Sequence, residues 1–404
     1  MAITEIDSLE FDTTICIEPH VTLLDSTHLI IAYQGPDEDA FIKTFSFDGS
    51  YDTLTEIDSL EHDSDATYSV GEEGSLITID STHVMLAYLG FETGSFATQL
   101  IIKTFTIDGS YNITETDKYI PSNVYPKGYD NSLVMLDSTH FILAFRGVND
   151  DGFIMTMSID GSYTISGIDF LEHDIYSGYS NSMVKIDSSH VALAYLGAGS
   201  DGQIKTFSVD GSCDNITEID DLEIVEGAYG SGSLQLVDST HLILAFSMTG
   251  ANEQSNDAFI KTFSFDGSYD TLTEIDSLEH DTDNHQHQSL VQLNATNYAL
   301  AYDDFGLYDG YIKTFSLDGS YDITENENMT YDTSTIGHIQ LVAIDSTHAC
   351  LVYRGDGNDG FLKTFSLALA STDYDAYLFH GISDLTNFNG MLHASGITNI
   401  NGVT

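Results

Sequence analysis

The chain has 404 residues, and 64 acidic against 11 basic side chains give it a net charge of −53 at pH 7. This charge excludes an ordinary nucleic-acid binder, because phosphate binding needs clustered lysines and arginines. Hydrophobic residues make up 42% of the sequence and include 23 tyrosines and 22 phenylalanines, which is enough apolar material for a core. We therefore expect a folded, strongly acidic protein without a nucleic-acid partner.

The N-terminal residues, MAITEIDSLEFD, have neither the basic start nor the apolar stretch of a secretory signal. No apolar run in the sequence approaches the ~20 residues that span a bilayer. We expect no signal peptide and no membrane insertion. The three cysteines, Cys16, Cys213 and Cys350, lie far apart and predict neither a disulfide framework nor a metal-binding cluster.

Seven copies of one repeat follow this N-terminal segment. Each copy contains the tetrapeptide DSTH or a variant of it, followed by a segment of the FIKTFS type. Residues 41–63 and 259–281 are identical over 23 positions, which indicates an array made by duplication. The seven tetrapeptides start at Asp25, Asp80, Asp137, Asp187, Asp238, Asn294 and Asp345.

Each copy predicts four β-strands in chain order. The first strand ends at the Asp of DSTH, and the others are the segments of the HLILAY, FIKTFS and ITEIDSL types. These segments are rich in β-branched and aromatic residues, and the DST and DGS turns place Asp, Ser and Gly where tight turns need them. Four strands in every ~50 residues are typical of a propeller blade. The sequence therefore predicts an all-β, seven-bladed β-propeller of four-stranded antiparallel blades.

The two ends of the array predict how the ring closes. The last copy stops after its third strand, at residues 361–367, and ITEIDSLEFD at residues 3–12 supplies the missing fourth strand. We expect residues 3–12 to complete blade seven, so that residues 1–367 form the propeller without a free strand edge. Residues 368–404 are predicted to form a short C-terminal extension.

By these repeats the chain resembles seven-bladed propellers in general, although WD-repeat and kelch signatures are absent. The turn SFDGSY at residues 46–51 resembles a shortened Asp-box, the turn between the third and fourth strands of sialidase-like propeller blades. Here the turn is one residue short and lacks the Trp of that motif. The Asp-box is a structural turn in its family, so the resemblance implies a propeller and carries no activity.

The loops that follow the second and fourth strands vary in length and composition, whereas the DST and DGS turns are nearly constant. In a propeller these variable loops share one face, and loops on a rigid scaffold are where binding residues tend to lie. Tyrosines among small polar residues are typical of binding loops, although drift without function is the alternative. The residues expected to bind a ligand, such as a cell-surface glycan or receptor, are Tyr68, Tyr125, Tyr129, Tyr176, Tyr179, Tyr229, His285, His287, Tyr308 and Tyr331.

The histidines of DSTH and the lysines of IKTF each recur in six copies. We expect the histidines to pack at the start of the second strand with a hydrogen bond to the turn, and the lysines to neutralise nearby carboxylates on the third and fourth strands. The loop RGDGNDG brings Asp356, Asn358 and Asp359 together, but it lacks the register and the distal Glu of a calcium loop. We therefore expect no cofactor, and calcium at these three residues is the alternative.

Signatures of enzymes are absent from the sequence. A sialidase needs an arginine cluster, and this chain has only Arg146 and Arg354. Nucleophile elbows, phosphate loops and HExxH are missing, and no carboxylate pair stands out as the acid and base of a glycosidase. We expect that the protein is not an enzyme.

The sequence after Asp384 contains no charged side chain, which is an abrupt change in so acidic a chain. A polar, uncharged segment that keeps apolar residues can pair with another chain or fit a groove. We expect residues 368–404 to contact other structural protein chains, and packing on the propeller's own rim is the alternative. The residues expected to make this assembly contact are Phe388, Met391, Leu392, Ile397 and Ile400.

These observations favour a non-enzymatic structural or binding propeller displayed on the surface of an assembly. A virion is the expected assembly, with the chain as a bacteriophage decoration, fibre or receptor-binding protein at the virion surface or outside the cell. The C-terminal segment would anchor it and the variable loops would face outward. The alternatives are a free, lectin-like carbohydrate-binding propeller and a polysaccharide-cleaving enzyme, and a homo-oligomer is compatible with each.

Overall fold

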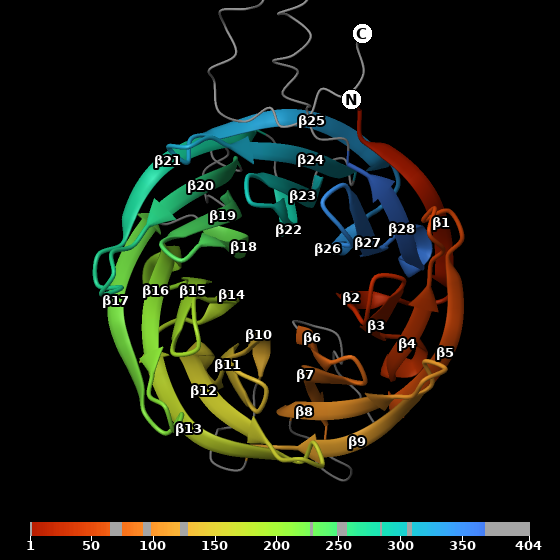
Figure 1. The fold of residues 1–404 in the computed structure, drawn as a ribbon, viewed down its shortest axis with the longest axis horizontal. Coiled ribbons are helices and arrows are strands. Elements are labelled where there is room, and N and C mark those ends of the chain that lie inside the picture. The colour runs from red at the N-terminus through yellow and green to blue at the C-terminus, as the bar shows by residue number, and fades with distance from the viewer. Residues whose placement is uncertain are drawn as a thin grey trace, which may run out of the picture. The chain divides into compact units, whose positions relative to one another are not determined.

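The computed structural model describes residues 2–64, 75–91, 98–121, 128–226, 229–248, 257–282, 285–304 and 309–367. These residues form seven four-stranded sheets that stand as blades around a central axis (Figure 1). No family-specific motif was needed to foresee this arrangement, because the repeat length and the turn residues already indicate it. The predicted seven-bladed, all-β propeller is confirmed.

The blades are numbered by their order in the sequence, and the strands of each blade run from the axis outward. Blade one consists of β2 (Ile17–Leu23), β3 (His28–Gln34), β4 (Ala40–Ser46) and β5 (Thr55–Asp63). Blade two consists of β6 (Ser75–Asp80), β7 (His83–Phe91), β8 (Thr98–Ile107) and β9 (Ile113–Tyr119). Blade three consists of β10 (Tyr129–Met135), β11 (His140–Arg146), β12 (Gly152–Ile159) and β13 (Ile165–Asp174). Blade four consists of β14 (Tyr179–Lys185), β15 (His190–Leu196), β16 (Gly202–Val209) and β17 (Ile216–Val225).

The remaining blades have the same order. Blade five consists of β18 (Tyr229–Asp238), β19 (His241–Met248), β20 (Ala258–Ser264) and β21 (Thr273–Asp281). Blade six consists of β22 (His285–Asn294), β23 (Asn297–Asp304), β24 (Gly310–Leu317) and β25 (Ile323–Asp332). Blade seven consists of β26 (Gly337–Ala343), β27 (His348–Arg354), β28 (Gly360–Ser366) and β1 (Thr4–Asp12). Four 3₁₀ turns join second to third strands, namely η1 (Pro36–Glu38), η2 (Val148–Asp150), η3 (Ala198–Ser200) and η4 (Asp356–Asn358).

The N-terminal strand closes the ring. Strand β1 pairs antiparallel with β28, with Thr4 opposite Ser366 and Glu10 opposite Phe361. It thereby becomes the outermost strand of blade seven, as the truncated last repeat predicts. None of the described helices is long and apolar enough to cross a membrane.

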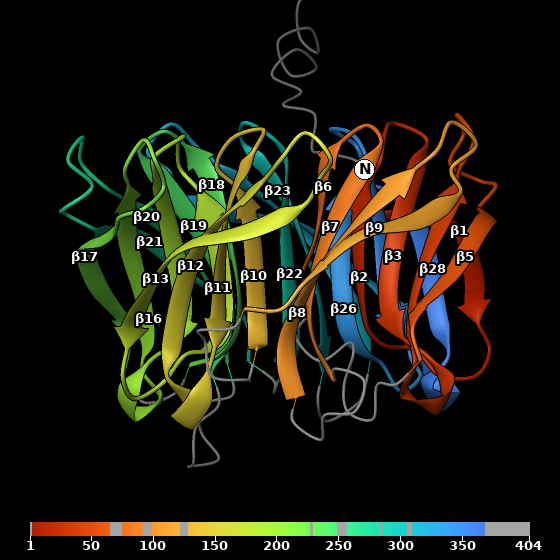
Figure 2. The same ribbon diagram turned by 90° about the horizontal axis from the view of Figure 1, so that it is seen from below.

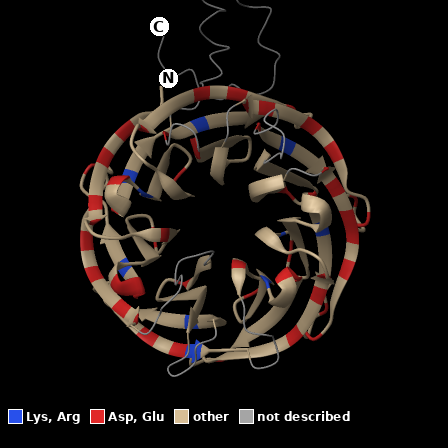
Figure 3. Cartoon of the chain, turned by 180° about the vertical axis from the view of Figure 1, so that it is seen from behind, with Lys and Arg blue, Asp and Glu red and all other residues tan. Residues whose placement is uncertain are grey.

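Burial changes from the middle of a blade to its outer edge. The second strand β3 is buried along almost its whole length, whereas the outer strand β5 alternates between exposed and partly buried positions. Figure 2 shows the twist that accompanies this change, from the upright inner strands β10 and β22 to the inclined outer strands β9 and β13. The acidic residues follow the outer strands around the ring, and lysines lie further in (Figure 3).

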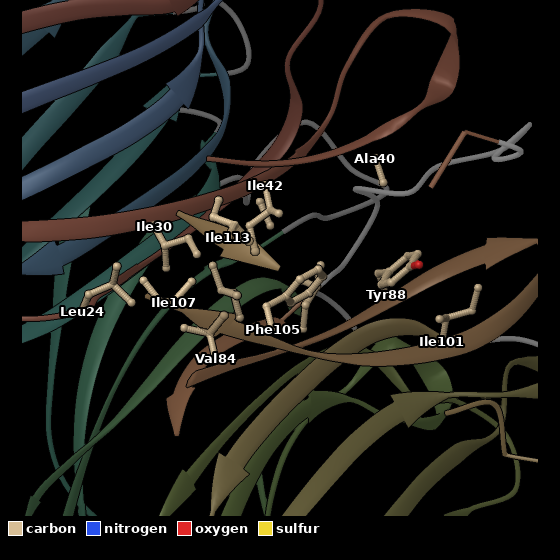
Figure 4. Close-up of a cluster of buried hydrophobic side chains, with 13 residues drawn as sticks. Leu24, Ile30, Ala40, Ile42, Val84, Tyr88, Ile101, Phe105, Ile107 and Ile113 are labelled. Carbon is tan, nitrogen blue, oxygen red and sulfur yellow. The ribbon is translucent and has the colours of Figure 1, made fainter. Parts of the chain in front are cut away.

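The core is divided into layers between neighbouring blades. One cluster joins Leu24, Ile30 and Ile42 of blade one to Val84 and Phe105 of blade two (Figure 4). These side chains come from opposite faces of two sheets, so each blade buries both of its faces against its neighbours. A single blade has no core of its own, and stability depends on the whole ring.

The lysine of the IKTF segment links two blades. Lys43 Nζ in blade one donates to the carbonyl of Phe11 in blade seven at 3.0 Å and to Glu56 of its own blade at 3.0 Å. This confirms the expected neutralisation of an outer-strand carboxylate and adds a contact to the neighbouring blade. Five further lysines make the same pair of contacts, namely Lys103, Lys205, Lys261, Lys313 and Lys363.

The DSTH turn is joined to the DGSY turn of the next blade. His28 Nδ1 lies 3.0 Å from Asp25 of its own turn, as expected, and the ring of Tyr111 from blade two stacks on His28 with centroids 3.5 Å apart. The Tyr111 hydroxyl donates to Asp25 at 2.7 Å. Partial burial raises the pKa of Asp25, but the hydrogen bonds from Tyr111, His28 and Thr27 outweigh this effect and lower the pKa to about 2. We call this contact the blade joint.

The blade joint recurs around the ring. Its tyrosine has a left-handed backbone, with φ of 63° at Tyr111, and its carbonyl accepts a hydrogen bond from Thr44 of blade one. Four other joints contain both the stack and the hydroxyl contact, and they are formed by Tyr51 with Asp345, Tyr163 with Asp80, Tyr269 with Asp187 and Tyr321 with Asp238.

Blade four lacks the tyrosine of the joint. Cys213 occupies its position with φ of 58°, so Asp137 and His140 of blade three receive no ring. Replacing Cys213 by tyrosine is expected to raise the melting temperature, because the stack and the hydrogen bond contribute about 1 kcal/mol each. Tyr163→Cys is expected to lower it by a similar amount. Thermal unfolding followed by circular dichroism measures both variants, and a C213Y protein no more stable than the parent would contradict this role of the joint.

Three histidines are buried at the outer edge between blades. His173 lies beneath Tyr195 of the next blade, with ring centroids 4.8 Å apart. Burial, reinforced by the charge of Lys205, lowers the pKa of His173 to about 3. Burial also lowers the pKa of His280 to about 3, and that of His62 well below its ordinary value. These three side chains are therefore neutral in the folded protein.

Acidification is expected to destabilise the propeller from about pH 6.5 downward, where histidines of the unfolded chain begin to bind protons that the folded chain does not. Each such histidine lowers the free energy of unfolding by about 1.4 kcal/mol per pH unit until its folded pKa is reached. His173→Phe copies blade seven, which has Phe11 at this position, and should reduce the slope. Urea unfolding between pH 7.5 and 4.5 measures it, and an unchanged slope would show that His173 is not responsible.

Candidate functional site

A cavity of about 490 Å³ lies on the propeller axis between the innermost strands. Six blades contribute to its wall, through β2, β10, β14, β18, β22 and β26, with one residue from β19. Figure 1 shows these inner strands around the axis. The residues that line it are Glu18, Pro19, His20, Asp130, Asn131, Ser180, Asn181, Gly230, Ser231, Gly232, Ser247, Gln286, His287, His338, Ile339 and Gln340.

Each contributing inner strand carries a β-bulge where it meets the cavity. In β10, for example, the register with β11 shifts between Tyr129 and Ser132, and Asp130 lies within that shift with φ of 53°. A bulge turns the side chain of the extra residue away from the sheet, and bulges recur next to active sites for this reason. We call the cavity-facing residues at this position the bulge residues: Glu18, Asp130, Ser180, Ser231, His287 and His338.

Every bulge residue has a companion sixteen positions later, on the second strand of its blade. In three blades the two side chains are chemically complementary and in contact. Asp130 binds Arg146 at 2.6 Å, the hydroxyls of Ser231 and Ser247 lie 3.3 Å apart, and His287 Nδ1 lies 3.0 Å from Asp303. The other companions are Gln34, Leu196 and Arg354. The joints are nearly constant around the ring, whereas these pairs differ from blade to blade.

Two imidazoles from neighbouring blades meet in the cavity wall. Asp303, which is buried, holds Nδ1 of His287, and Glu18 of blade one lies 3.3 Å from Nδ1 of His338. The two rings have centroids 4.8 Å apart. A carboxylate on Nδ1 fixes the tautomer in which that nitrogen carries the hydrogen, which leaves Nε2 as the proton acceptor.

The two histidines differ in their surroundings. Burial, together with the charges of His287, Arg354 and His20, lowers the pKa of His338 to about 2, so this ring stays neutral. The side chain of His287 is 30% exposed and its carboxylate partner Asp303 is 5% exposed. An accessible imidazole oriented by a buried carboxylate is the arrangement of a general base.

The opposite side of the cavity is held by an arginine sandwich. The guanidinium of Arg146 lies between the rings of Tyr129 and Tyr179, at 4.4 and 3.9 Å from their centroids. It also binds Asp150 at 3.1 Å in addition to Asp130. Asp130 in turn accepts a hydrogen bond from the backbone of Ser180 in blade four at 2.7 Å. The charge of Arg146 is thus neutralised behind the cavity wall.

Of the predicted ligand-binding residues that the structure describes, His287 alone lines this cavity. Tyr229 and Tyr331 are buried and pack against Phe246 and Tyr353 respectively, so they do not project from a loop as expected. His285 is buried with Nε2 at 3.0 Å from Asp281.

Two of the other predicted tyrosines, Tyr129 and Tyr179, contact Arg146. Tyr176 is 72% exposed and lies outside the cavity wall. Tyr68, Tyr125 and Tyr308, together with the predicted assembly residues Phe388, Met391, Leu392, Ile397 and Ile400, lie outside the described residues.

The residues considered for calcium form a turn. Asp356 and Asn358 belong to η4, and Asp359 follows it as the residue that leads into β28. Among the residues that the structure describes, no group of three His, Cys, Asp or Glu side chains is arranged to hold a metal ion.

Apart from His287, sequence reasoning did not find the bulge residues, because they belong to no constant motif and lie near the start of the first strand rather than in a loop. The signal that was present is the constant offset of sixteen residues between Asp130 and Arg146 and between His287 and Asp303. That offset has meaning only once the pairing of the two strands is known.

No family model matches the sequence, and no curated protein matches it. Solved structures with the same fold are numerous. The periplasmic gluconolactonase of Pseudomonas aeruginosa superposes with a TM-score of 0.59 at 12% identity, covering 83% of this chain and 94% of that one. A candidate 6-phosphogluconolactonase from Bacteroides fragilis gives a TM-score of 0.55 at 14% identity, covering 78% and 84%.

A third structure is an ulvan lyase, from a new family of polysaccharide lyases, bound to a GlcA(1-4)Rha3S unit. It superposes with a TM-score of 0.53 at 12% identity, covering 89% of this chain and 96% of that one. At these identities the likeness shows the fold alone. It nevertheless corrects the expectation that the protein is not an enzyme. That expectation came from the absence of enzyme signatures in the sequence, whereas solved propellers of this shape include lactonases and a lyase.

Arg146→Leu is expected to lower the free energy of unfolding by about 3 kcal/mol, because it leaves the buried carboxylate of Asp130 without its counter-ion. The double variant Asp130→Ser with Arg146→Leu copies blade four, which has Ser180 and Leu196 at these positions, and should recover most of that loss. Denaturant unfolding measures all three proteins. A double variant as unstable as the single one would contradict the pairing.

Proposed function

We propose that the protein is an enzyme that binds a carbohydrate-type substrate in the axial cavity and begins its reaction by transferring a proton to His287. The observation that carries this proposal is the contact between His287 Nδ1 and the buried carboxylate of Asp303 at 3.0 Å, which aims the second ring nitrogen at the substrate. The lining residues also include amide and hydroxyl side chains, which suit a polyhydroxylated ligand, namely Asn131, Asn181, Gln286, Gln340, Ser180, Ser231 and Ser247.

The chemistry follows from the position of the imidazole. His287 Nε2 accepts a proton either from a water molecule or from a carbon next to a carbonyl group, and Asp303 stabilises the imidazolium that forms. The neighbouring ring of His338 stays neutral, so it does not repel that imidazolium with a charge of its own. Hydrolysis of a lactone and elimination from a uronate both begin with such a proton transfer, and both activities occur among propellers of this fold.

The predicted location at a virion or extracellular surface stays a prediction, as do the contacts of residues 368–404 with other protein chains. The described residues that line the cavity all lie between positions 18 and 340. Display on a virion is compatible with an enzyme that acts on surface carbohydrate.

His287→Gln is expected to lower kcat by about 10²- to 10⁴-fold, the usual contribution of a general base, and Asp303→Asn to lower it less. Asp303→Asn should keep the parental melting temperature to within a few degrees. His287→Gln should lower it, because the buried Asp303 loses its imidazole partner, so kcat is compared at a temperature where both proteins are folded. A panel of sugar lactones and uronate-containing polysaccharides, assayed for acid release and for new double bonds, provides the measurement.

His140→Gln is the matched control, because His140 lies in a DSTH turn far from the cavity and has no stacked tyrosine. It should retain full activity. A parent protein that turns over neither class of substrate, or a His287→Gln variant as active as the parent, would refute the proposal.

A further inference from the structure

We infer that the axial cavity selects an uncharged, hydroxyl-rich substrate of the sugar-lactone class, held by the side-chain oxygens of Asn131 and Asn181 on the side opposite the histidines. This inference rests on the proposed function and chooses between the two reactions that His287 is able to begin. It is carried by two independent features of the wall, namely the orientation of two amides and the distribution of charge.

The two amides are fixed by their nitrogen atoms. Asn131 Nδ2 donates to the carbonyl of Gly128 at 2.7 Å. Asn181 Nδ2 donates to the carbonyls of Gly178 at 2.9 Å and of Asp130 at 3.0 Å. Because the amino groups are engaged by the backbone, each amide presents its oxygen as an acceptor on its other side.

Those oxygens have no hydrogen-bond partner among the described residues. Asn131 is only 7% exposed, and its Oδ1, like that of Asn181, is buried. Buried polar atoms are almost always hydrogen-bonded in folded proteins. Both residues line the cavity, so a ligand that enters it is well placed to supply the missing donor, and a hydroxyl group is such a donor.

The repeat shows that the framework does not require these amides. Blade six also has an amide, Gln288, at the equivalent position, one residue after the bulge residue, but three other blades have Pro19 (blade one), Gly232 (blade five) and Ile339 (blade seven) there. None of the latter three side chains forms hydrogen bonds, and their blades have the same four strands. The asparagines of blades three and four are therefore suited to recognition rather than to folding.

The amides and the histidines lie on opposite sides of the cavity. Strands β10 and β14 carry Asn131 and Asn181, whereas β22 and β26 carry His287 and His338, and the two pairs of strands face each other across the axis in Figure 1. A substrate that spans the cavity therefore places its hydroxyl-bearing end at the asparagines and its reactive group at His287.

Charge distinguishes a lactone from a uronate. Among the described residues that line the cavity, Glu18 and Asp130 carry carboxylates, and none is a lysine or an arginine. Arg146 is bound to Asp130 and Asp150, and a Cβ at Gly337 would lie 2.8 Å from Arg354 Nη2, so Arg354 packs against the inner strand. Because Asp130 is paired with Arg146, the repulsion comes from Glu18 and from the net charge of −53. It disfavours an anionic polysaccharide relative to a neutral sugar derivative.

The reaction that fits is hydrolysis of the lactone. His287 Nε2 removes a proton from water, the water oxygen bonds to the lactone carbonyl carbon, and the ring C–O bond breaks. The leaving oxygen takes the proton back from His287, and the product is a hydroxy acid. That acid ionises to a carboxylate, which the same negative wall repels, so the charge that disfavours anionic substrates also favours product release.

The first test separates substrates by charge on one sugar frame. The probes are D-glucuronamide and D-glucuronate for binding by saturation-transfer NMR, and D-glucono-1,5-lactone and D-galactono-1,4-lactone for turnover. We expect the neutral amide to bind about tenfold more tightly than the anion at low salt, with the difference shrinking as salt screens the charge. Equal or tighter binding of glucuronate would overturn the inference.

The second test assigns the subsite. Asn131→Ala and Asn181→Ala should each raise KM for the lactone about tenfold, the effect of losing one good hydrogen bond, while kcat changes by less than about twofold. Asn215→Ala, in the turn between β16 and β17, is the matched control. If an alanine variant loses its parental melting temperature, Asn131→Leu and Asn181→Leu, which fill the same volume, replace it. Unchanged KM in folded variants would overturn the role of the amides.

The outcomes also separate this inference from the proposed function. Turnover of uronate polymers that requires His287, without turnover of lactones, would leave the proposed function standing and overturn the choice of substrate. A parent protein that neither binds the sugars nor acts on any of these substrates would overturn both. Lactone turnover that is lost in His287→Gln and weakened in KM by the asparagine variants supports both.

Discussion

The blade joint is the contact on which the rest of the molecule depends. Propeller blades are joined along the chain only by loops, and each blade lacks a core of its own, so the angle between neighbours must be fixed by contacts across the gap. The joint does this with atoms from two blades: Asp25 holds His28 of its own turn, and Tyr111 of the next blade both stacks on the ring and donates to the carboxylate. Because the DSTH turn and the DGSY tyrosine recur, the same contact joins most pairs of neighbouring blades.

The joint is absent at two places. Between blades three and four only the tyrosine has changed, to Cys213, whereas between blades six and seven both sides have changed. Blade seven has ALAS at residues 368–371 where other blades have DGSY, and blade six has Asn294 and Asn297 in place of the Asp and His that the tyrosine would contact. The hydroxyl of Thr314, whose counterparts bind the tyrosine carbonyl, is left without a hydrogen-bond partner among the described residues. The outer edge shows the same coupling: Tyr33 donates to Asp12, but Phe246 replaces the tyrosine where the preceding blade ends in Val225.

This coupling explains how much the sequence reveals. The constant motifs are the joints, and their spacing was sufficient to predict seven blades, four strands in each and the closing strand at residues 3–12. The cavity was not predicted, because a bulge such as that at His287 is a property of the backbone, and no residue type marks it. Tyr229 and Tyr331 were placed on a surface from loop composition alone, whereas the ends of β18 and β25 bury them. Packing of strand ends against the next blade decides their exposure, and a single sequence does not show that packing.

An asymmetric site is possible within this repeated fold because the blade joints and the cavity are formed by different parts of each blade. The joints, the lysine contacts and the outer tyrosines hold each blade through its middle and outer strands, so the start of the inner strand is free to change without loosening the ring. Six blades each contribute a bulge residue to the described wall, and a buried carboxylate such as Asp303 is tolerated only because His287 changed with it. In blade three the buried carboxylate of Asp130 is likewise tolerated because Arg146 is its counter-ion. The acidic outer ring (Figure 3) surrounds all of these pairs, so the potential that they experience is negative throughout, and the chemistry of the cavity is set blade by blade within it.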